Sequence, residues 1–185
     1  LADEIMSKEP DLVGLSSYVW NINTVRSLLA FVKHKVKSQF VVGGPEITDK
    51  WINSPEDALL ADYAIIGAGE YKLLHLVHYM RGFENRMPEG IAYWERGSLI
   101  YADGKKEIEN LDIIPSIYLD SVIEDQYYAN QEAYVETMRG CKYRCKYCVY
   151  HKNLDKVYYY SLDRVFKELT YLIAEKQVVS LRIFD

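Results

Sequence analysis

Three cysteines lie close together in the sequence, and they are all the cysteines that the chain has. Cys141, Cys145 and Cys148 form the pattern Cys-x3-Cys-x2-Cys, with Tyr147 directly before the last thiol. Thiolates are the soft ligands that bind iron–sulfur clusters or zinc, and three of them in one loop can meet a single metal centre. Three is one fewer than a closed four-ligand site needs, and an open coordination position lets a bound metal act on a substrate.

A zinc site is the alternative for the same loop. His151 follows Cys148 at a spacing that zinc knuckles also use, and it would complete a Cys3His tetrahedron. A lone histidine beside Lys152 and Asn153 equally fits a loop residue that faces water. Disulfide bonding is disfavoured, because an odd number of cysteines leaves one thiol over and nothing in the sequence indicates an oxidising compartment.

The composition is typical of a soluble globular protein. The 185 residues suffice for one core, or for one small domain and part of another; 49% are hydrophobic, 26% are charged, and the net charge is -5. No broad basic surface is indicated, so no nucleic-acid partner is expected. No apolar run of about eighteen residues predicts a membrane span, and residues 1–10 do not resemble a secretory signal. A reducing cytoplasm is the expected location.

Short hydrophobic runs alternate with helical patterns in the first part, which predicts a parallel sheet with right-handed crossovers. The expected strands cover residues 11–16, 40–42 and 62–66. An opening helix ends at Pro10, and Asn21 or Asn23 can cap the next one. The expected helices after the strands cover 22–36, 55–60 and 70–82.

Serines and glycines follow the three predicted strands. Because the carboxyl ends of parallel strands meet at one edge, where open α/β folds bind ligands, these loops are expected to lie together. Each loop alone equally fits a tight turn, whereas all three together favour a binding crevice that a bulky ligand can approach closely. The candidate binding residues are Ser16, Ser17, Gly43, Gly44, Gly67, Gly69 and Glu70.

The chain changes character after residue 85. A β-hairpin around the turn 95–98, a second turn at 103–105 and a linker are expected next. A strand at 134–138, a helix capped by Ser161 and a strand from residue 181 then predict a β-loop-α-β unit, with the cysteine loop after its first strand. This unit fits the start of a partial (β/α) barrel of the TIM type. The predicted domains are 1–85, 86–130 and 131–185.

Two of the expected helices carry apolar stripes that should face a core. The stripe of the helix at 70–82 comprises Leu73, Leu74, Val77 and Met80. The stripe of the helix after Ser161 comprises Leu162, Val165, Phe166, Leu169, Leu172 and Ile173.

The cysteine loop resembles the signature of the radical S-adenosylmethionine (SAM) enzymes. The resemblance covers all three cysteines, Tyr147 and the preceding residues 136–140. It implies that Cys141, Cys145 and Cys148 ligate a [4Fe-4S] cluster and that Tyr147 lies beside the adenine. In that family the open iron chelates S-adenosylmethionine, an electron from the cluster cleaves the sulfonium, and the resulting 5′-deoxyadenosyl radical abstracts hydrogen.

Residues 1–83 look like the Rossmann-like cobalamin-binding domain of methionine synthase and its relatives. The segments 11–16 and 41–45 carry this resemblance, and 67–70 is similar to a Gly-x-Gly-Glu motif of radical enzymes. It implies that cobalamin binds in the predicted crevice. The Asp-x-His-x-x-Gly motif, whose histidine ligates cobalt in methionine synthase, is not present. The histidines on the predicted helices are interpreted as surface residues: His34, His75 and His78.

Together the resemblances imply a cobalamin-dependent radical SAM enzyme, similar to the anaerobic Mg-protoporphyrin monomethyl ester cyclases. The implied reaction is methylation, cyclisation or rearrangement of a small organic substrate, with an electron donor such as flavodoxin or ferredoxin. Lys142, Arg144 and Lys146 beside the thiols could dock that donor, or they are solvated loop charges. The alternative is a binding or regulatory module that keeps the cobalamin-type fold without catalysis.

The two ends of the sequence resemble those of an internal fragment, since the chain opens in a helical rhythm at Leu1 and stops within a predicted strand at Asp185. We expect the first part to fold, with one sheet edge exposed. The second part is expected to lack strands that would support a metal site. We therefore expect this chain alone to be catalytically inactive, with neither a cluster at the cysteines nor cobalamin in the crevice.

Overall fold

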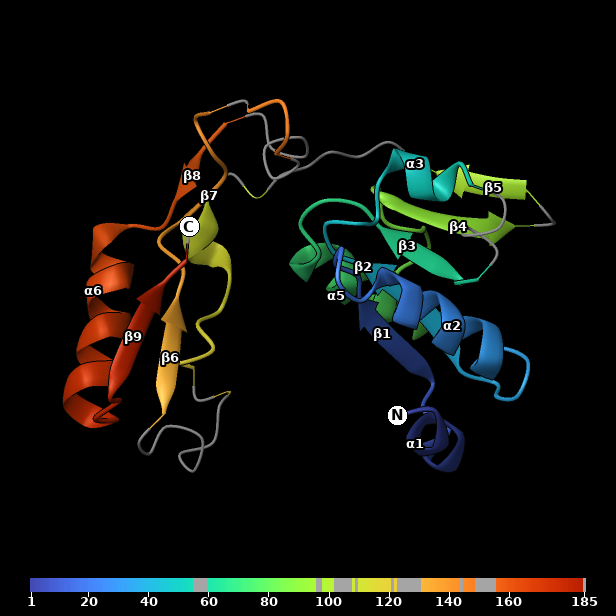
Figure 1. Cartoon of the computed structure of the whole chain (residues 1–185), viewed down its shortest axis with the longest axis horizontal. Helices are drawn as coiled ribbons and strands as arrows, with labels where there is room; N and C mark the ends of the chain where they lie inside the picture. Colours follow the sequence, from blue (N-terminus) through green and yellow to red (C-terminus); the bar gives the residue numbers. More distant parts are fainter. Residues whose placement is uncertain are drawn as a thin grey trace. The chain divides into compact units, whose positions relative to one another are not determined.

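The computed structural model describes residues 1–54, 60–95, 98–101, 108, 110–120, 122, 131–143, 145–148 and 156–184. Its contacts divide the chain into two units, Leu1–Glu107 and Ile108–Asp185 (Figure 1). Most of the predicted helix at 55–60, the centre of the hairpin turn, the turn at 103–105, Arg144 and His151 lie outside the described residues. No helix in the described part of the chain is long and apolar enough to cross a membrane.

Unit 1 is built on a five-stranded sheet in the order β1-β2-β3-β4-β5. As the sequence predicts, β1 (Leu12–Ser16), β2 (Gln39–Gly43) and β3 (Tyr63–Ile65) are parallel. The hairpin of β4 (Ile91–Glu95) and β5 (Ser98–Tyr101) continues the sheet in antiparallel pairing. The hairpin therefore belongs to the sheet of unit 1, whereas the sequence places it in a connector. The predicted domain boundaries stay a prediction.

Helices cover both faces of this sheet (Figure 1). Alternate residues of β2 point to opposite faces, which is the geometry of a strand buried on both sides. Phe40 and Val42 pack with α1 (Ala2–Lys8), α2 (Ile22–Val32) and α3 (Asp49–Ile52), while Val41 packs with Leu76 of α5 (Glu70–Met80). The result is a three-layer α/β/α unit.

The apolar stripe predicted for α5 is only partly right, because Met80 packs against the core but Leu73 and Leu74 do not. Leu73 and Leu74 are 40% and 46% exposed, and the buried residues are Lys72 and Leu76. Lys72 occupies the core-facing position one turn before Leu76 because its amine donates to the Ile66 carbonyl at 2.5 Å. Because a lysine occupies one of the buried positions of α5, the pattern of hydrophobic residues does not mark the face of the helix that is buried.

Unit 2 contains the predicted β-loop-α-β arrangement. Strands β6 (Glu132–Val135) and β9 (Ser180–Ile183) pair in parallel, and α6 (Leu162–Thr170) lies between them in sequence. A π-helical turn, η4 (Tyr171–Glu175), continues α6, and a 3-10 turn, η1 (Leu111–Ile113), precedes β6. The core is small and centres on Tyr118, Ala133, Val135 and Leu172.

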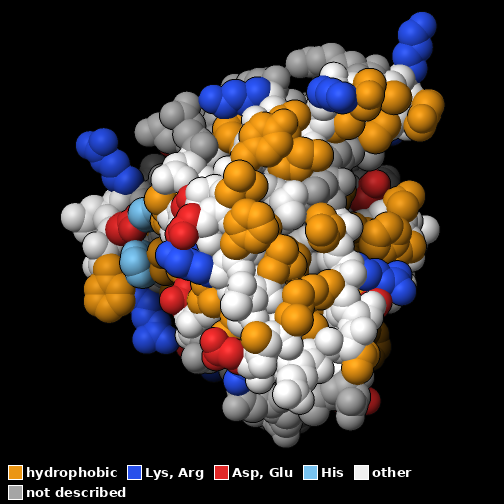
Figure 2. Space-filling view, turned by 90° about the vertical axis from the view of Figure 1, so that its left-hand side faces the viewer, with side chains coloured by type: hydrophobic (Ala, Val, Ile, Leu, Met, Phe, Trp, Pro, Cys, Tyr) orange, Lys and Arg blue, Asp and Glu red, His pale blue; other side chains and the backbone are white. Residues whose placement is uncertain are grey.

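Helix α6 begins as predicted, with the Ser161 hydroxyl accepting from the Arg164 N–H at 3.1 Å. Its predicted stripe is only partly buried. Val165 and Leu172 face the core, whereas Leu162, Phe166 and Ile173 are 72%, 62% and 56% exposed. Figure 2 shows hydrophobic side chains gathered on the face turned toward the viewer.

Candidate functional site

The loops after β1 and β2 are in direct contact at the carboxyl edge of the sheet. The Ser17 N–H donates to the Gly43 carbonyl at 2.7 Å, and the Glu46 N–H donates to the Ser17 carbonyl at 3.2 Å. Gly44 has a φ of 102°, and a Cβ there would lie 2.7 Å from the backbone carbonyl oxygen of Ser17. A side chain at Gly44 would therefore force the two loops apart, in addition to its backbone strain.

Ser17, whose backbone makes this contact, also carries a buried hydroxyl. Ser17 is fully buried, and its Oγ has no hydrogen-bond partner among the described residues. An unsatisfied buried hydroxyl costs about 1–3 kcal/mol, and such groups in folded proteins usually meet a ligand or an ordered water. Ser17 is thus a buried polar group at this edge that lacks a hydrogen-bond partner among the described residues.

The third predicted loop runs from β3 to α5. Gly67 has a φ of 78°, Gly69 is the N-cap of α5, and Glu70 is the first residue of that helix. A Cβ at Gly43 or at Gly69 would meet Ile65 at an ordinary 3.9 Å, so both glycines lie against the end of β3. The structure therefore places the predicted edge residues at the carboxyl ends of the parallel strands or directly after them: Ser16 and Gly43 end β1 and β2, and the others follow the strands. Their role in binding stays a prediction.

An aromatic segment at the same edge is not identified by the sequence analysis. Tyr18 and Trp20 stack with ring centroids 4.7 Å apart, and Val19 and Trp20 are 72% and 76% exposed. Asn21 fixes the segment, because its side chain accepts from the Tyr18 N–H at 2.7 Å and donates to the Ser16 carbonyl at 2.9 Å. Three consecutive large apolar residues after the end of a strand are the signal that could have found this exposed surface.

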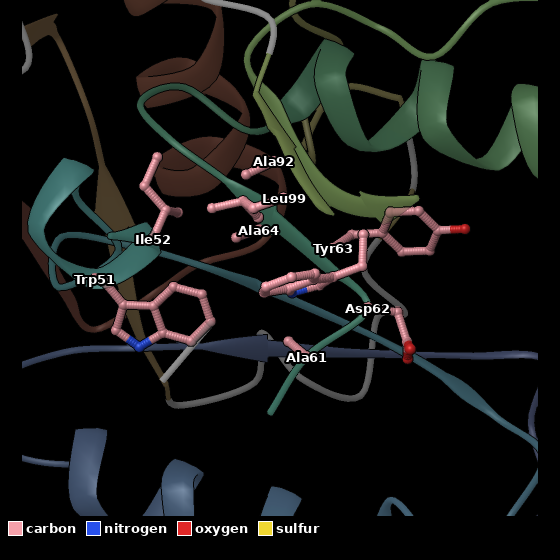
Figure 3. A pocket seen from close by; sticks show the side chains of 9 residues that line it. Trp51, Ile52, Ala61, Asp62, Tyr63, Ala64, Ala92 and Leu99 are labelled. Atoms are coloured by element: carbon pink, nitrogen blue, oxygen red, sulfur yellow. The ribbon is translucent and has the colours of Figure 1, made fainter. Parts of the chain in front are cut away.

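A hydrophobic pocket between α3 and the sheet lies elsewhere in unit 1. Figure 3 shows Trp51 and Ile52 of α3 facing Ala64, Ala92 and Leu99 of the sheet. Among the described residues of its lining, the charged one is Asp62, which precedes β3 and accepts from the Phe40 N–H at 2.8 Å. This pocket therefore begins at the amino end of β3, away from the glycine loops, and it is not the candidate site.

In unit 2 the cysteine loop starts and ends in a short two-stranded ladder. Strand β7 (Met138–Arg139) pairs with β8 (Tyr158–Tyr159), and Gly140 leaves β7 with a φ of 104°. The thiols are free and half-buried, and the Cys148 N–H donates to the Cys145 carbonyl at 3.0 Å. Tyr147 is 90% exposed, so its ring is open to a ligand.

A polar network holds the base of this loop. Both carboxylate oxygens of Glu136 accept from the Arg139 Nε at 2.9 Å, and the Tyr160 N–H donates to the Thr137 carbonyl at 3.0 Å. The strand predicted at 134–138 is therefore interrupted, since β6 ends at Val135 and the chain changes partner from β9 to β8. The ladder fixes both ends of the loop while the cysteines between them remain accessible.

The thiol sulfur atoms of the three described cysteines do not lie close enough together to bind one ion. Among the described residues, the group whose ligand atoms lie close enough for one ion is His75, His78 and Glu84 in unit 1. The Cys3His alternative depends on His151, which is outside the described residues. The geometry therefore leaves both metal interpretations of the cysteine loop as predictions.

Comparison with solved structures defines the class of fold. The parallel-sheet core matches the cobalamin-binding domain of radical SAM methyltransferases. TsrM from Kitasatospora setae, solved with cobalamin and a [4Fe-4S] cluster bound, aligns with a TM-score of 0.67 and 16% identity over 100% of this chain and 39% of its own. OxsB, solved with aqua-cobalamin and S-adenosylmethionine bound, aligns with a TM-score of 0.64 and 18% identity over 96% of this chain and 26% of its own.

Sequence relatives point to the same group of enzymes. The chain is 29% identical over 157 residues to the cobalamin-dependent radical SAM methyltransferase TokK of Streptomyces tokunonensis, covering 80% of this chain and 23% of TokK. It is 27% identical over 190 residues to an uncharacterized methyltransferase of Pyrococcus horikoshii, covering 100% of this chain and 41% of that protein. No protein-family model matches. The chain is thus similar to cobalamin-dependent radical SAM methyltransferases and spans less than half of their length.

Proposed function

We propose that this chain forms the cobalamin-binding part and the cluster-binding loop of a cobalamin-dependent radical SAM enzyme. The observation that carries the proposal is the presence of both elements in one chain. An α/β unit with serine and glycine loops at the carboxyl edge of its sheet is followed by a Cys-x3-Cys-x2-Cys loop that a β-ladder holds at both ends. A non-catalytic binding module would need the first element but has no need of three cysteines at this spacing.

The cysteine loop would hold the iron–sulfur cluster. Cys141, Cys145 and Cys148 supply three thiolates, which leaves one iron open for S-adenosylmethionine. The exposed ring of Tyr147 is available to pack beside the adenine. The ion pair between Arg139 and Glu136 orients the start of the loop, because it ties the β7 backbone to the residue that follows β6.

The edge formed by the loops after β1, β2 and β3 fits a large cofactor. The buried Ser17 hydroxyl would gain the hydrogen bond that it lacks among the described residues, and the glycines keep the backbone open to close approach. The exposed segment Tyr18–Trp20 offers apolar surface to a corrin ring. We assign Ser16, Ser17, Gly43, Gly44, Gly67, Gly69 and Glu70 to this cofactor site. Cobalamin, when bound, supplies a cobalt centre that carries the methyl group.

Methyl transfer to a small organic substrate is the reaction that the relatives favour, since TokK and TsrM are both methyltransferases. The comparisons do not support the resemblance to Mg-protoporphyrin cyclases, and cyclisation or rearrangement is the second candidate reaction. An electron donor such as flavodoxin or ferredoxin would reduce the cluster. Oxygen-sensitive cluster chemistry favours a reducing cytoplasm.

Metal analysis of anaerobically purified protein tests the cluster. We expect the full-length protein, as distinct from this chain alone, to be brown and to hold about four iron and four sulfide after reconstitution, as a [4Fe-4S] site with three cysteines requires. Cys145→Ser should abolish the iron content, and His151→Ala should leave it unchanged. Zinc in place of iron, lost on His151→Ala, would refute the proposal in favour of a Cys3His site.

Two serine variants test the cofactor edge. Ser17→Ala removes the hydroxyl at the carboxyl edge, and we expect it to weaken cobalamin binding by the full-length protein about fivefold to tenfold, the value of one hydrogen bond. Ser38→Ala is the matched control, because Ser38 is also buried without a partner among the described residues but precedes β2 at the opposite edge. The cobalamin affinities are measured by equilibrium dialysis. Equal affinities of the two variants would show that Ser17 is not part of the cobalamin site.

A further inference from the structure

Two histidines and a glutamate form a cluster that the proposed function does not use. His75 and His78 lie on α5, and Glu84 follows the end of that helix. The Nδ1 of His75 is 2.6 Å from the Glu84 Oε1, and the Nδ1 of His78 is 3.3 Å from the same oxygen. Because α5 starts at the carboxyl edge of the sheet and runs back toward the amino ends, the cluster is remote from the glycine loops.

A helix-ending motif fixes the position of Glu84. Gly82 has a φ of 75°, its N–H donates to the Tyr79 carbonyl at 3.0 Å, and the Phe83 N–H donates to the His78 carbonyl at 2.9 Å. This pair of hydrogen bonds is the Schellman motif, which turns the chain back across the last turn of the helix. The Phe83 ring also meets the His78 ring edge-on at 6.0 Å. The backbone therefore holds Glu84 beside both imidazoles.

The three ligand atoms have the chemistry and spacing of a zinc-type site. They all lie within 4.8 Å of one another. Tetrahedral zinc bonds to imidazole nitrogen and carboxylate oxygen at about 2.0–2.2 Å, which places neighbouring ligand atoms about 3.3 Å apart. The His78–Glu84 separation already has this value, and the His75–Glu84 contact needs to open by less than about 1 Å. The side chains are 46%, 40% and 30% exposed for His75, His78 and Glu84, so an ion can reach them.

The charges around the cluster also favour a cation. The Glu84 carboxylate lies within hydrogen-bond distance of both imidazoles, so its charge faces the position between them. A cation that replaces the hydrogen shared between Glu84 and His75 would keep the carboxylate paired and would engage both imidazoles at once.

We propose that His75, His78 and Glu84 bind a divalent transition-metal ion of the zinc class, with a fourth position open to water. The ion joins the last turns of α5 to the segment that follows the helix. It is separate from the cysteine loop and from the edge assigned to cobalamin.

Zinc titration by calorimetry tests this site, in a chain that carries no histidine tag. Cys141, Cys145 and Cys148 are replaced by serine, so that thiolates contribute no second site. We expect about one zinc per chain at neutral pH. His75→Ala and Glu84→Gln should each weaken binding by at least about tenfold, since even residues that support a metal ligand contribute this much. His34→Ala is the control, because His34 is exposed in unit 1 and outside the cluster.

The shift of the thermal unfolding temperature on adding zinc is a second test of the site. Zinc should raise the unfolding temperature of the parent protein and of His34→Ala but not of His75→Ala, because binding to the native state alone stabilises it. If the protein with the three cysteines replaced by serine does not fold, zinc content is measured in the chain that keeps its cysteines. His75→Ala should then lower the zinc content by about one ion per chain. No zinc bound to the parent, or equal binding by the parent and His75→Ala, would overturn the proposal.

Discussion

Unit 1 and unit 2 are both built from parallel strands and connecting helices, yet they bury hydrophobic residues very differently. In unit 1 helices cover both faces of the sheet, and Leu29, Val32, Phe40 and Val42 are at most 1% exposed. In unit 2 the described residues bury one face of the β6–β9 pair against α6, while Tyr134, Ile183 and Phe184 are at least half exposed.

The difference shows what a single β-α-β element can stabilise by itself. One helix shields one face of a strand pair, so the other face of the strands remains accessible. Unit 2 compensates with polar contacts: the Glu168 carboxylate, almost fully buried, accepts from Ser116 Oγ and Arg164 Nε at 2.6 Å each. We infer that unit 1 depends mainly on its hydrophobic core, whereas unit 2 depends to a larger extent on this polar network.

The largest expected effect comes from a matched pair of phenylalanine truncations. Phe40→Ala removes a fully buried ring from unit 1 and should lower the free energy of unfolding by about 3–5 kcal/mol. Phe166→Ala in unit 2 removes a ring that is 62% exposed and should change it by less than about 0.5 kcal/mol. Urea denaturation followed by circular dichroism measures both. A large loss on Phe166→Ala would mean that the exposed face of α6 is covered in solution.

A smaller effect is expected from two ion pairs with the same spacing on α6. Glu168→Gln leaves the Arg164 guanidinium without its charged partner in a mostly buried position and should cost about 2–3 kcal/mol. Asp163→Asn breaks the exposed pair with Lys167 and should cost less than about 1 kcal/mol.

Salt distinguishes these two pairs further. Added salt should reduce the effect of Asp163→Asn and leave that of Glu168→Gln nearly unchanged, because buried pairs are screened less than exposed ones. Urea denaturation at low and high salt measures both dependences. Equal costs for the two variants would contradict the assignment of unit 2 stability to the buried network.

The sequence predicted the strands of unit 1 better than it predicted the buried faces of the helices. Phe40, Val41 and Val42 form a continuous apolar run, which is what burial on both faces requires. The stripes predicted on α5 and α6 are only partly right, because Lys72 and Glu168 occupy core-facing positions. Lys72 pairs with the Ile66 carbonyl, and Glu168 pairs with the Ser116 hydroxyl in addition to Arg164 of its own helix; the first two partners lie outside the respective helices. Periodicity within one helix cannot anticipate such partners.

The same distinction applies to the candidate sites. The spacing of Cys141, Cys145 and Cys148 is local, so it could be read directly from the sequence. The packing of Ser17 against Gly44 depends on how β1 and β2 pair, and only the structure shows it. The meeting of Glu84 with His75 and His78 depends on the turn at Gly82, because the sequence alone gives no direction to the chain after a helix ends.

The smallest expected effect concerns the contact between η1 and α6 within unit 2. The Asp112 carboxylate accepts from the N–H of Ser161, the N-cap of α6, at 2.9 Å. Hydrogen bonding from the Ser161 side chain, and then from its backbone, lowers the pKa of Asp112 in the folded protein. A carboxyl with a lowered folded pKa adds stability above its unfolded pKa, and this contribution is lost as the pH falls through the folded value.

Asp112→Asn should therefore be less stable than the parent at neutral pH, by less than about 1 kcal/mol because the group lies near solvent. The difference in unfolding free energy between the two proteins should decrease as the pH falls below about 4, where the Asp112 carboxyl of the parent takes up its proton. Urea denaturation of both proteins at stepped pH values measures this difference. If it stays constant down to about pH 3, ionised Asp112 does not stabilise the start of α6, and the hydroxyl cap of Ser161 acts alone.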